Sequence, residues 1–483
     1  MSPSIIDETR IALGGIKDFA RSFAQPNLRL GVTGLAHSGK TVFITALVHN
    51  LLHGGRLPLL SAYSGGRIAR AYLEPQPDYE LPRFDYESHV ETLTSENRRW
   101  PDSTRRLSEL RLTIEYRGQG LFSRDGVPRV LSIDILDYPG EWLLDLPLMQ
   151  LSYAEWSAAT LKTSRRAPRA LLAKAFHDYL ATVDPQARRD EMQAVKAAEL
   201  FTAYLSRCRA DDVALSTLPP GRFLMPGDLA GSPLLTFAPL NLAADATARR
   251  GSLFALMEKR YEAYVAHVVK PFFRDYFARL DRQIVLVDAL SALNAGRDAV
   301  IDLRTALTEV LAVYRQGSSS WVSQILGRRI DRILFAATKA DQLHHSSHNR
   351  LEAIMQAMLK EASARAEFQG ALVDVSALAA IRATREAVVK QKGEELPCIV
   401  GVPEMSERIG SSVFDGETEA AVFPGDLPEN PLQALKGNLE EQVRFVRFRP
   451  PVLKADAGLG VGSSFPHIRL DRVLEFLFGD RLT

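Results

Sequence analysis

The residues whose chemistry is easiest to assign lie between positions 34 and 41. They read Gly34-Leu35-Ala36-His37-Ser38-Gly39-Lys40-Thr41, which fits the pattern G-x-x-x-x-G-K-[ST]. Because they lack a Cβ, Gly34 and Gly39 let successive backbone N–H groups point at one anion. Lys40 supplies a positive charge for the β- and γ-phosphates of a nucleotide, and the Thr41 hydroxyl can bind Mg²⁺. The pattern therefore predicts a phosphate-binding loop.

The residues on either side support this prediction. Residues 28–33 read as a short buried strand, and residues 42–48, which begin with Val42, carry apolar side chains at helical spacing. A strand, a glycine-rich turn and a helix N-terminus together suit an anion, because the helix dipole adds to the N–H groups of the loop. We expect the nucleotide to contact residues 34–42.

A second motif, Asp137-Tyr138-Pro139-Gly140, closes a strand predicted at 129–137. A carboxylate at the end of a strand beside the phosphate loop can hold Mg²⁺, usually through water. We therefore expect Thr41 and Asp137 to face the metal ion. Gly140 can bring its backbone N–H close to a γ-phosphate because no side chain intervenes. The alternative is a Pro-Gly turn with an incidental aspartate.

A third motif, Thr338-Lys339-Ala340-Asp341, follows an apolar strand predicted at 332–337. A carboxylate at Asp341 can accept hydrogen bonds from N1–H and from the exocyclic amine of guanine. Adenine offers no such pair of donors, so a buried aspartate selects guanine. The Lys339 stem can lie along the base, and Thr338 stands where asparagine is usual. The alternative is a solvated lysine and aspartate in a loop.

The next strand, predicted at 372–375, is followed by Ser376, Ala377 and Leu378. We expect this loop to lie beside the base, with the backbone N–H of Ala377 donating to the guanine oxygen. The dipeptide Ser-Ala is common, so only its position after a strand supports this prediction.

Hydrolysis of a nucleotide needs mainly positioning and charge stabilisation. Glu141 follows Gly140, where small GTPases carry a glutamine that orients water. A carboxylate can orient water, but its charge repels the γ-phosphate, so we expect slow turnover. Thr104, and after it Ser103, is the candidate hydroxyl that reaches Mg²⁺ when a γ-phosphate is present. Arg98 and Arg99 can act as an arginine finger, but an exposed basic pair is the favoured interpretation.

Composition narrows the class of protein. The chain has 483 residues, of which 46% are hydrophobic and 24% charged, as in folded globular proteins of two or three domains. A net charge of +1 provides no general attraction to nucleic acid. Cys208 and Cys398 have no metal-ligand spacing and form no disulfide framework, which favours a reducing compartment.

The N-terminal residues do not read as a signal peptide, and we find no apolar run of 18 residues. These features predict a cytoplasmic protein without a transmembrane segment. Residues 5–23 are mildly amphipathic. We interpret them as a helix packed on the protein, and a peripheral membrane contact is the alternative.

Strand and helix patterns alternate along much of the chain, which predicts an α/β fold with a mostly parallel sheet covered by helices on both faces. The stretch 146–280 reads as helical throughout. We expect five parts: an N-terminal helix at 1–25, a first core part at 26–145, a helical insertion at 146–280, a second core part at 281–390 and a C-terminal extension at 391–483.

The motifs in this order resemble translation-factor-class GTPases, and more closely the bacterial YcjX-like family of P-loop GTPases. The resemblance is carried by residues 34–41, by Trp100-Pro101-Asp102-Ser103-Thr104 and by residues 137–147, which read DYPGEWLLDLP. It implies a Ras-like core with a helical domain inserted after the third strand. It also implies GTP and Mg²⁺ binding, slow hydrolysis and a role in stress at the cell envelope, with an integral membrane protein as partner and a place at the inner membrane.

Three functions agree with these observations. The first is a GTP-hydrolysing switch in which the γ-phosphate orders residues 98–104 and 137–147. The second is an ATPase of the same fold. The third is a scaffold that binds a nucleotide without hydrolysing it and holds a protein partner through its helical insertion.

Overall fold

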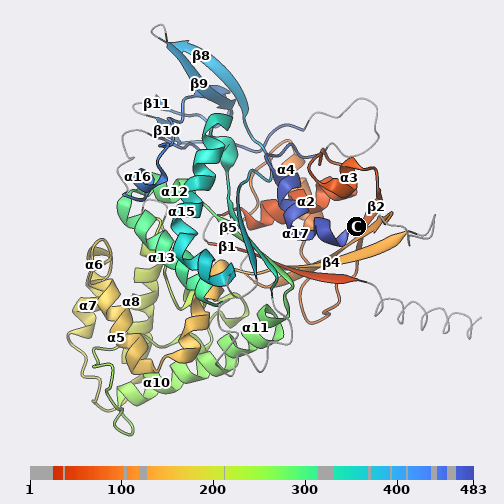
Figure 1. Ribbon diagram of the computed structural model, residues 1–483. Helices are drawn as coiled ribbons and strands as arrows, with labels where there is room; N and C mark the ends of the chain where they lie inside the picture. The colour runs from red at the N-terminus through yellow and green to blue at the C-terminus, as the bar shows by residue number, and fades with distance from the viewer. Residues whose placement is uncertain are drawn as a thin grey trace, which may run out of the picture.

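The computed structural model describes residues 26–35, 38–102, 106–118, 128–210, 213–313, 330–367, 371–391, 394–409, 412–436, 443–453 and 464–483. Its centre is a seven-stranded sheet with the order β2-β3-β4-β1-β5-β6-β7 (Figure 1). The strands are β1 (Asn27–Gly34), β2 (Ile68–Glu74), β3 (Ser108–Tyr116), β4 (Arg129–Asp137), β5 (Arg282–Val287), β6 (Arg332–Ala337) and β7 (Leu372–Ala377).

Strand direction in this sheet is mixed. The strands β4, β1, β5, β6 and β7 run parallel to one another. At the other edge, β2 and β3 pair antiparallel, and so do β3 and β4. The central strands β1, β5 and β6 are almost entirely buried, as expected for parallel strands covered on both faces. The predicted α/β fold is confirmed.

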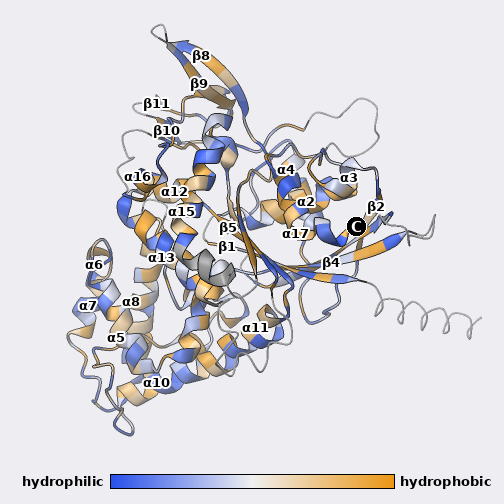
Figure 2. Ribbon diagram, in the orientation of Figure 1, coloured by the Kyte–Doolittle hydropathy of each residue, from blue (hydrophilic) through white to orange (hydrophobic). Residues whose placement is uncertain are grey.

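Helices cover both faces of the sheet (Figure 1). One face packs against α2 (Lys40–Leu52) and α17 (Leu470–Phe478), and the other against α13 (Arg297–Val313) and α15 (His348–Glu367). Neighbouring residues of β5 face opposite sides of the sheet. Ile284 packs in the core cluster that contains α2 and α17, and Val285 packs in the cluster that contains α13 and α15. Figure 2 shows hydrophobic residues along the strands between these helices.

The region between β4 and β5 is built of helices, as predicted. It begins with a 3₁₀ helix at Gly140–Gln150, labelled η1. The α-helices that follow are α5 (Tyr153–Ser164), α6 (Arg169–Leu172), α7 (Lys174–Leu180), α8 (Glu191–Arg209), α9 (Gly221–Leu224), α10 (Leu253–Tyr264) and α11 (Lys270–Asp275). They lie beside the sheet in Figure 1. The division of the chain into separate domains stays a prediction.

Local sequence explains where several of these helices begin. Ser152 and Glu155 form a reciprocal capping box at the start of α5. The side chain of Asp190 accepts hydrogen bonds at the start of α8, and the side chain of Ser252 accepts one at the start of α10. Each cap satisfies backbone N–H groups that have no partner inside the helix.

Two parts of the fold were not predicted from the sequence. The stretch 53–104, which reads as an irregular loop, holds β2 together with α3 (Ser61–Ser64) and α4 (Tyr86–Thr94). After β7 comes a three-stranded antiparallel sheet of β8 (Arg385–Gln391), β9 (Glu394–Gly401) and β12 (Ala420–Val422). The short strands β10 (Arg408–Ile409) and β11 (Ser412–Val413) pair beside it, and α12 (Ala289–Ala295) and α16 (Pro431–Leu435) complete the set of described α-helices.

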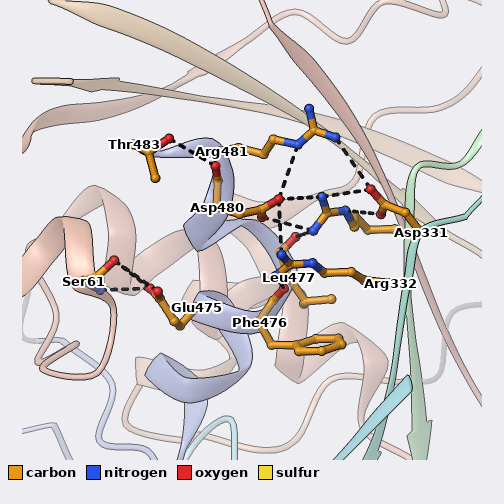
Figure 3. A network of polar contacts seen from close by, with 10 residues as sticks. Ser61, Asp331, Arg332, Glu475, Phe476, Leu477, Asp480, Arg481 and Thr483 are labelled. Atoms are coloured by element: carbon orange, nitrogen blue, oxygen red, sulfur yellow. Dashed lines mark hydrogen bonds and ion pairs between the residues drawn. The ribbon is translucent and has the colours of Figure 1, made fainter. Parts of the chain in front are cut away.

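The C-terminal residues are held against the sheet by a network of charges (Figure 3). Arg282 of β5 is 1% exposed and pairs with Asp331 at 2.5 Å and with Asp480 at 2.9 Å. Arg332 lies 3.3 Å from the same Asp480 and donates to the carbonyl of Phe476. Because a buried guanidinium needs partners for its charge and its N–H groups, these contacts fix α17 and the 3₁₀ turn Gly479–Arg481 on β5 and β6.

None of the helices in the described ranges has both the length and the apolar character needed to cross a membrane.

Candidate nucleotide-binding site

The phosphate loop connects β1 to α2, as predicted. Gly39 has φ of 79°, a left-handed conformation that favours glycine, and α2 begins at the next residue. The N–H of Ser38 donates to the carbonyl of Leu35 at 3.2 Å. The ammonium of Lys40 donates to the carbonyl of Gly34 at 3.3 Å, so this side chain folds back over the loop. Ala36 and His37 lie outside the described residues.

The second motif packs directly on this loop. A Cβ at Gly140 would come within 2.5 Å of the carbonyl oxygen of Gly34, so only glycine fits at this position. Gly140 thus lies in backbone contact with the loop, where its N–H was predicted to meet a γ-phosphate.

Thr41 and Asp137 are the oxygen ligands predicted for Mg²⁺. Thr41 is in the first turn of α2, and Asp137 is the last residue of β4, in register with Val32 of the neighbouring β1. Both side chains are buried, at 5% and 1% exposure. A hydroxyl and a carboxylate are hard oxygen donors, which suit Mg²⁺. Thr104 and Ser103, the other candidates, lie outside the described residues.

The third motif forms the loop after β6. Lys339 has φ of 61°, and its ammonium lies 2.5 Å from the carboxylate of Asp288 at the end of β5. The N–H of Thr338 donates to the carbonyl of Val287 at 2.9 Å, which ties the loop to that same strand. The parallel register of β5 and β6 therefore places the lysine beside the neighbouring strand end.

Asp341 is buried, at 7% exposure, and one carboxylate oxygen accepts the N–H of Ala383 at 2.9 Å. The Thr384 hydroxyl donates to the backbone carbonyl of Asp341 at 2.6 Å. Burial raises the pKa of Asp341 to about 6, against the opposing effects of the Ala383 N–H and of Lys339. The carboxyl is therefore mostly ionised at neutral pH, as an acceptor for two N–H donors must be.

The segment predicted as a loop after residue 375 differs from the prediction, because β7 runs through Ser376 and Ala377. The N–H of Ala377, expected to meet the guanine oxygen, donates instead to the carboxylate of Glu352 at 2.9 Å. The N–H of Leu378 donates to the carbonyl of Ala337 at 2.8 Å, and the hydroxyl of Ser376 lies 3.3 Å from the carbonyl of Ala377. In this structure Leu378 and the residues after it, rather than Ser376 and Ala377, line the space beside Asp341.

A cavity of about 250 Å³ joins the loop after β1, the loop after β6 and the residues after β7, while Asp137 and Gly140 are not among its lining residues. Its lining comprises residues 38–43 of the phosphate loop and α2, Thr338, Lys339, Asp341 and Gln342, and residues 378–381. Two further groups complete it: residues 100–102, and Glu404, Arg447 and Phe448 from the C-terminal part of the chain. The cavity therefore spans the predicted phosphate loop and the predicted base-reading aspartate.

The C-terminal residues of the lining were missed by the sequence reasoning. The indole N–H of Trp100 donates to the carbonyl of Phe448 at 2.7 Å, and Arg98 donates to the carbonyl of Pro450 at 2.7 Å. These bonds join positions about 350 residues apart, which no local pattern indicates. They also give Arg98 a structural contact, and the arginine-finger alternative stays a prediction.

Comparison with known proteins shows the family of this chain. Residues 28–482 match the model of the YcjX-like family, DUF463. The chain belongs to the YcjX-like family. It is 36% identical over 469 residues to the Ras-like GTPase YcjX of Escherichia coli strain K12, covering 94% of this chain and 96% of that protein. It is also 36% identical over 481 residues to the Ras-like GTPase YcjX of Shewanella oneidensis, covering 95% of each chain. The family resemblance expected from the sequence is confirmed.

In this member of the family, Glu141 faces the helical region. Its side chain is 6% exposed and pairs with Arg209, the last residue of α8, at 3.1 Å. The backbone of Glu141 lies against Gly221, where a Cβ would come within 2.3 Å of the Glu141 carbonyl oxygen. The segment that follows Gly140 is thus attached to two helices of the insertion, α8 and α9.

The buried Asp145 makes a second contact between the segment after Gly140 and the helical region. It accepts hydrogen bonds from the N–H of Gly221 at 2.7 Å and from the hydroxyl of Tyr264, on α10, at 2.5 Å. Burial raises the pKa of Asp145 to about 7, against the effect of these donors. Beside it, the guanidinium of Arg222 lies 3.3 Å from the centre of the Trp142 ring.

Proposed function

We propose that this protein binds GTP in the described cavity, hydrolyses it slowly with Mg²⁺, and acts as a nucleotide-dependent switch. The observation that carries the proposal is the cavity itself, which is lined both by the phosphate loop at 38–41 and by Asp341. The names of the relatives in Escherichia coli and Shewanella oneidensis, both Ras-like GTPases, support the same class of activity.

In this proposal, the backbone N–H groups of the loop and the ammonium of Lys40 hold the β- and γ-phosphates. Lys40 now contacts the Gly34 carbonyl at 3.3 Å, a neutral acceptor that a phosphate oxygen replaces readily. The Thr41 hydroxyl and the Asp137 carboxylate hold Mg²⁺, with Thr104 as a further candidate. When bound, the ion neutralises charge that develops on the phosphate oxygens.

Guanine is selected by Asp341, whose charged carboxylate accepts two N–H donors that adenine does not present. The Lys339 stem lies along the base, and Thr338 holds the loop on β5. Because the N–H of Ala377 is bonded to Glu352, residues 378–381 provide the wall beside the base.

Slow turnover follows from the place of Glu141. A carboxylate paired with Arg209 at 3.1 Å is held toward α8, and its role in orienting water stays a prediction. The pair instead supports a mechanical role. When Gly140 moves to contact the γ-phosphate, the segment 140–150 moves with it and shifts the helical insertion.

The test is phosphate release from GTP by the purified full chain, with and without Mg²⁺. We expect slow release that needs Mg²⁺ and is lost in Lys40→Ala. Lys162→Ala, which removes an exposed lysine of α5, is the matched control and should keep the wild-type rate. Release that is unaffected by Lys40→Ala would overturn the proposal.

A scaffold that binds GTP without hydrolysing it is the second candidate, favoured by the Glu141–Arg209 pair because this contact draws the carboxylate away from the loop. A stable GTP complex over hours, with Mg²⁺ present, would support it over the GTPase. The proposed role in bacterial stress and a membrane-protein partner at the inner membrane stay predictions from the family resemblance.

A further inference from the structure

Two histidines and a glutamate meet a short way beyond the base-reading loop. His344 and His345 follow Asp341 closely in the chain, and Glu386 lies on β8. We propose that these three side chains form a binding site for a divalent transition-metal ion, with Zn²⁺ the best match for two imidazoles and a carboxylate.

The geometry is close to that of a three-ligand site. One nitrogen of each histidine and one oxygen of Glu386 all lie within 4.8 Å of one another. Nδ1 of His345 is 2.8 Å from Oε2 of Glu386, and Nε2 of His344 is 4.0 Å from the same oxygen. With bond lengths of about 2.0–2.1 Å, ligand atoms around a tetrahedral Zn²⁺ lie about 3.3 Å apart. Small side-chain rotations therefore suffice to enclose an ion.

Neighbouring groups orient these ligands. Arg382 lies 3.4 Å from Oε1 of Glu386, so the other oxygen, Oε2, is turned toward the histidines. Nδ1 of His344 lies 2.9 Å from the Ser346 hydroxyl and accepts the backbone N–H of Ser346 at 3.4 Å, and Nε2 is the ring nitrogen that faces Glu386. Contacts of this kind fix the direction of a metal ligand.

The site is open to solvent. The His345 side chain is 66% exposed and that of Glu386 is 29% exposed. An ion can therefore enter without local unfolding, and three protein ligands leave a fourth position for water. The exposure of His345 also means that its loss removes a ligand without opening a cavity.

The place of the site suggests what the ion would do. It joins the stretch 341–345 to the stretch 382–386, which are already linked by bonds from Ala383 and Thr384 to Asp341. His345 and Glu386 also join these stretches, at 2.8 Å, and a metal ion between them would strengthen this link and hold Asp341 more firmly at the edge of the cavity. Resting on the proposed function, this step predicts that Zn²⁺ raises the affinity for GTP.

The direct test is a Zn²⁺ titration of the full chain without a histidine tag, free of nucleotide, in competition with a chromogenic chelator. We expect one Zn²⁺ per chain. The dissociation constant should rise at least about tenfold in His345→Ala and in Glu386→Gln. His267→Ala, which removes an exposed histidine outside the cluster, should bind like the wild type.

Two results would overturn the proposal: no Zn²⁺ binding by the wild type, or equal binding by all four proteins. Because nucleotide is absent, neither result depends on GTP binding. Co²⁺ provides a second readout, since its visible absorption reports tetrahedral nitrogen and oxygen ligands and should disappear in both site variants. If Zn²⁺ binds as expected but leaves GTP affinity unchanged, the metal site stands and its link to Asp341 is overturned.

Discussion

Asp341 shows how one buried side chain can select a ligand. Its carboxylate is held at the cavity edge by the N–H of Ala383, and its charge has been withdrawn from water. A base with two suitable N–H donors restores the hydrogen bonds that burial removed, whereas a base without them leaves the charge unpaired. In the proposed function, selectivity therefore rests on hydrogen bonding at a single residue more than on the shape of the cavity.

Replacing this residue gives a specific prediction. Asp341→Asn exchanges one acceptor for a donor, which suits xanthine, because xanthine has a carbonyl where guanine has an amine. We expect GTP affinity to fall at least about 100-fold and the affinity for xanthosine triphosphate to rise. Competition binding with both nucleotides measures this, and an unchanged preference for GTP would refute the assignment of Asp341 to the base.

At the scale of elements, the segment 140–150 joins the phosphate loop to the helical insertion. Gly140 contacts Gly34 of the loop, while the neighbouring Glu141 and Asp145 contact α8, α9 and α10. Because the segment is packed against both the loop and the helices, a displacement on the loop side must be taken up on the helical side.

Glu141→Gln tests whether this residue acts in hydrolysis or in attachment. Breaking its buried pair with Arg209 should lower the free energy of unfolding by about 3 kcal/mol. The rate of GTP hydrolysis should change far less than the roughly 100-fold loss that follows removal of a catalytic base. In the double variant with Arg209→Met, the loss of stability should be smaller than the sum of the two single losses. A large fall in rate with unchanged stability would instead support water orientation by Glu141.

The buried Asp145 predicts a pH dependence of stability. Its pKa is about 7 in the folded protein and about 3.9 when unfolded, so between these values the folded state holds a proton that the unfolded state has lost. The contribution of Asp145 to stability is therefore full below about pH 4 and falls as pH rises to about 7, by up to about 1.4 kcal/mol per unit.

Urea unfolding of the wild type and of Asp145→Asn from pH 5 to pH 8 measures this contribution. The unfolding free energy of the wild type, relative to that of Asp145→Asn, should fall as the pH rises to about 7 and stay constant above that. Parallel curves over the whole range would contradict the assigned pKa.

For the whole molecule, local patterns in the sequence predicted the central strands, their flanking helices and the phosphate loop. Apolar runs such as 332–337 indicate buried strands without knowledge of their neighbours, because burial on both faces requires apolar side chains throughout. The order of motifs then predicted which strand ends meet, since parallel strands present their carboxyl ends at one edge of the sheet.

Contacts between distant parts of the chain could not be predicted in this way. The bond from Trp100 to Phe448, the pairing of Glu141 with Arg209 and the capture of the Ala377 N–H by Glu352 each depend on how separate elements pack. The sheet of β8, β9 and β12 was also missed. Its strand β8 exposes the two consecutive residues Val388 and Val389, so it lacks the clean alternation of a half-buried strand.

The central claim is that one cavity reads both the phosphates and the guanine base. The most direct measurement is displacement of a fluorescent GTP analogue from the nucleotide-free full chain by GTP and by ATP, with Mg²⁺ present. We expect GTP to displace the analogue at micromolar concentration or below and ATP to need at least about 100-fold more. Equal displacement by GTP and ATP, or no binding of the analogue, would contradict the central claim.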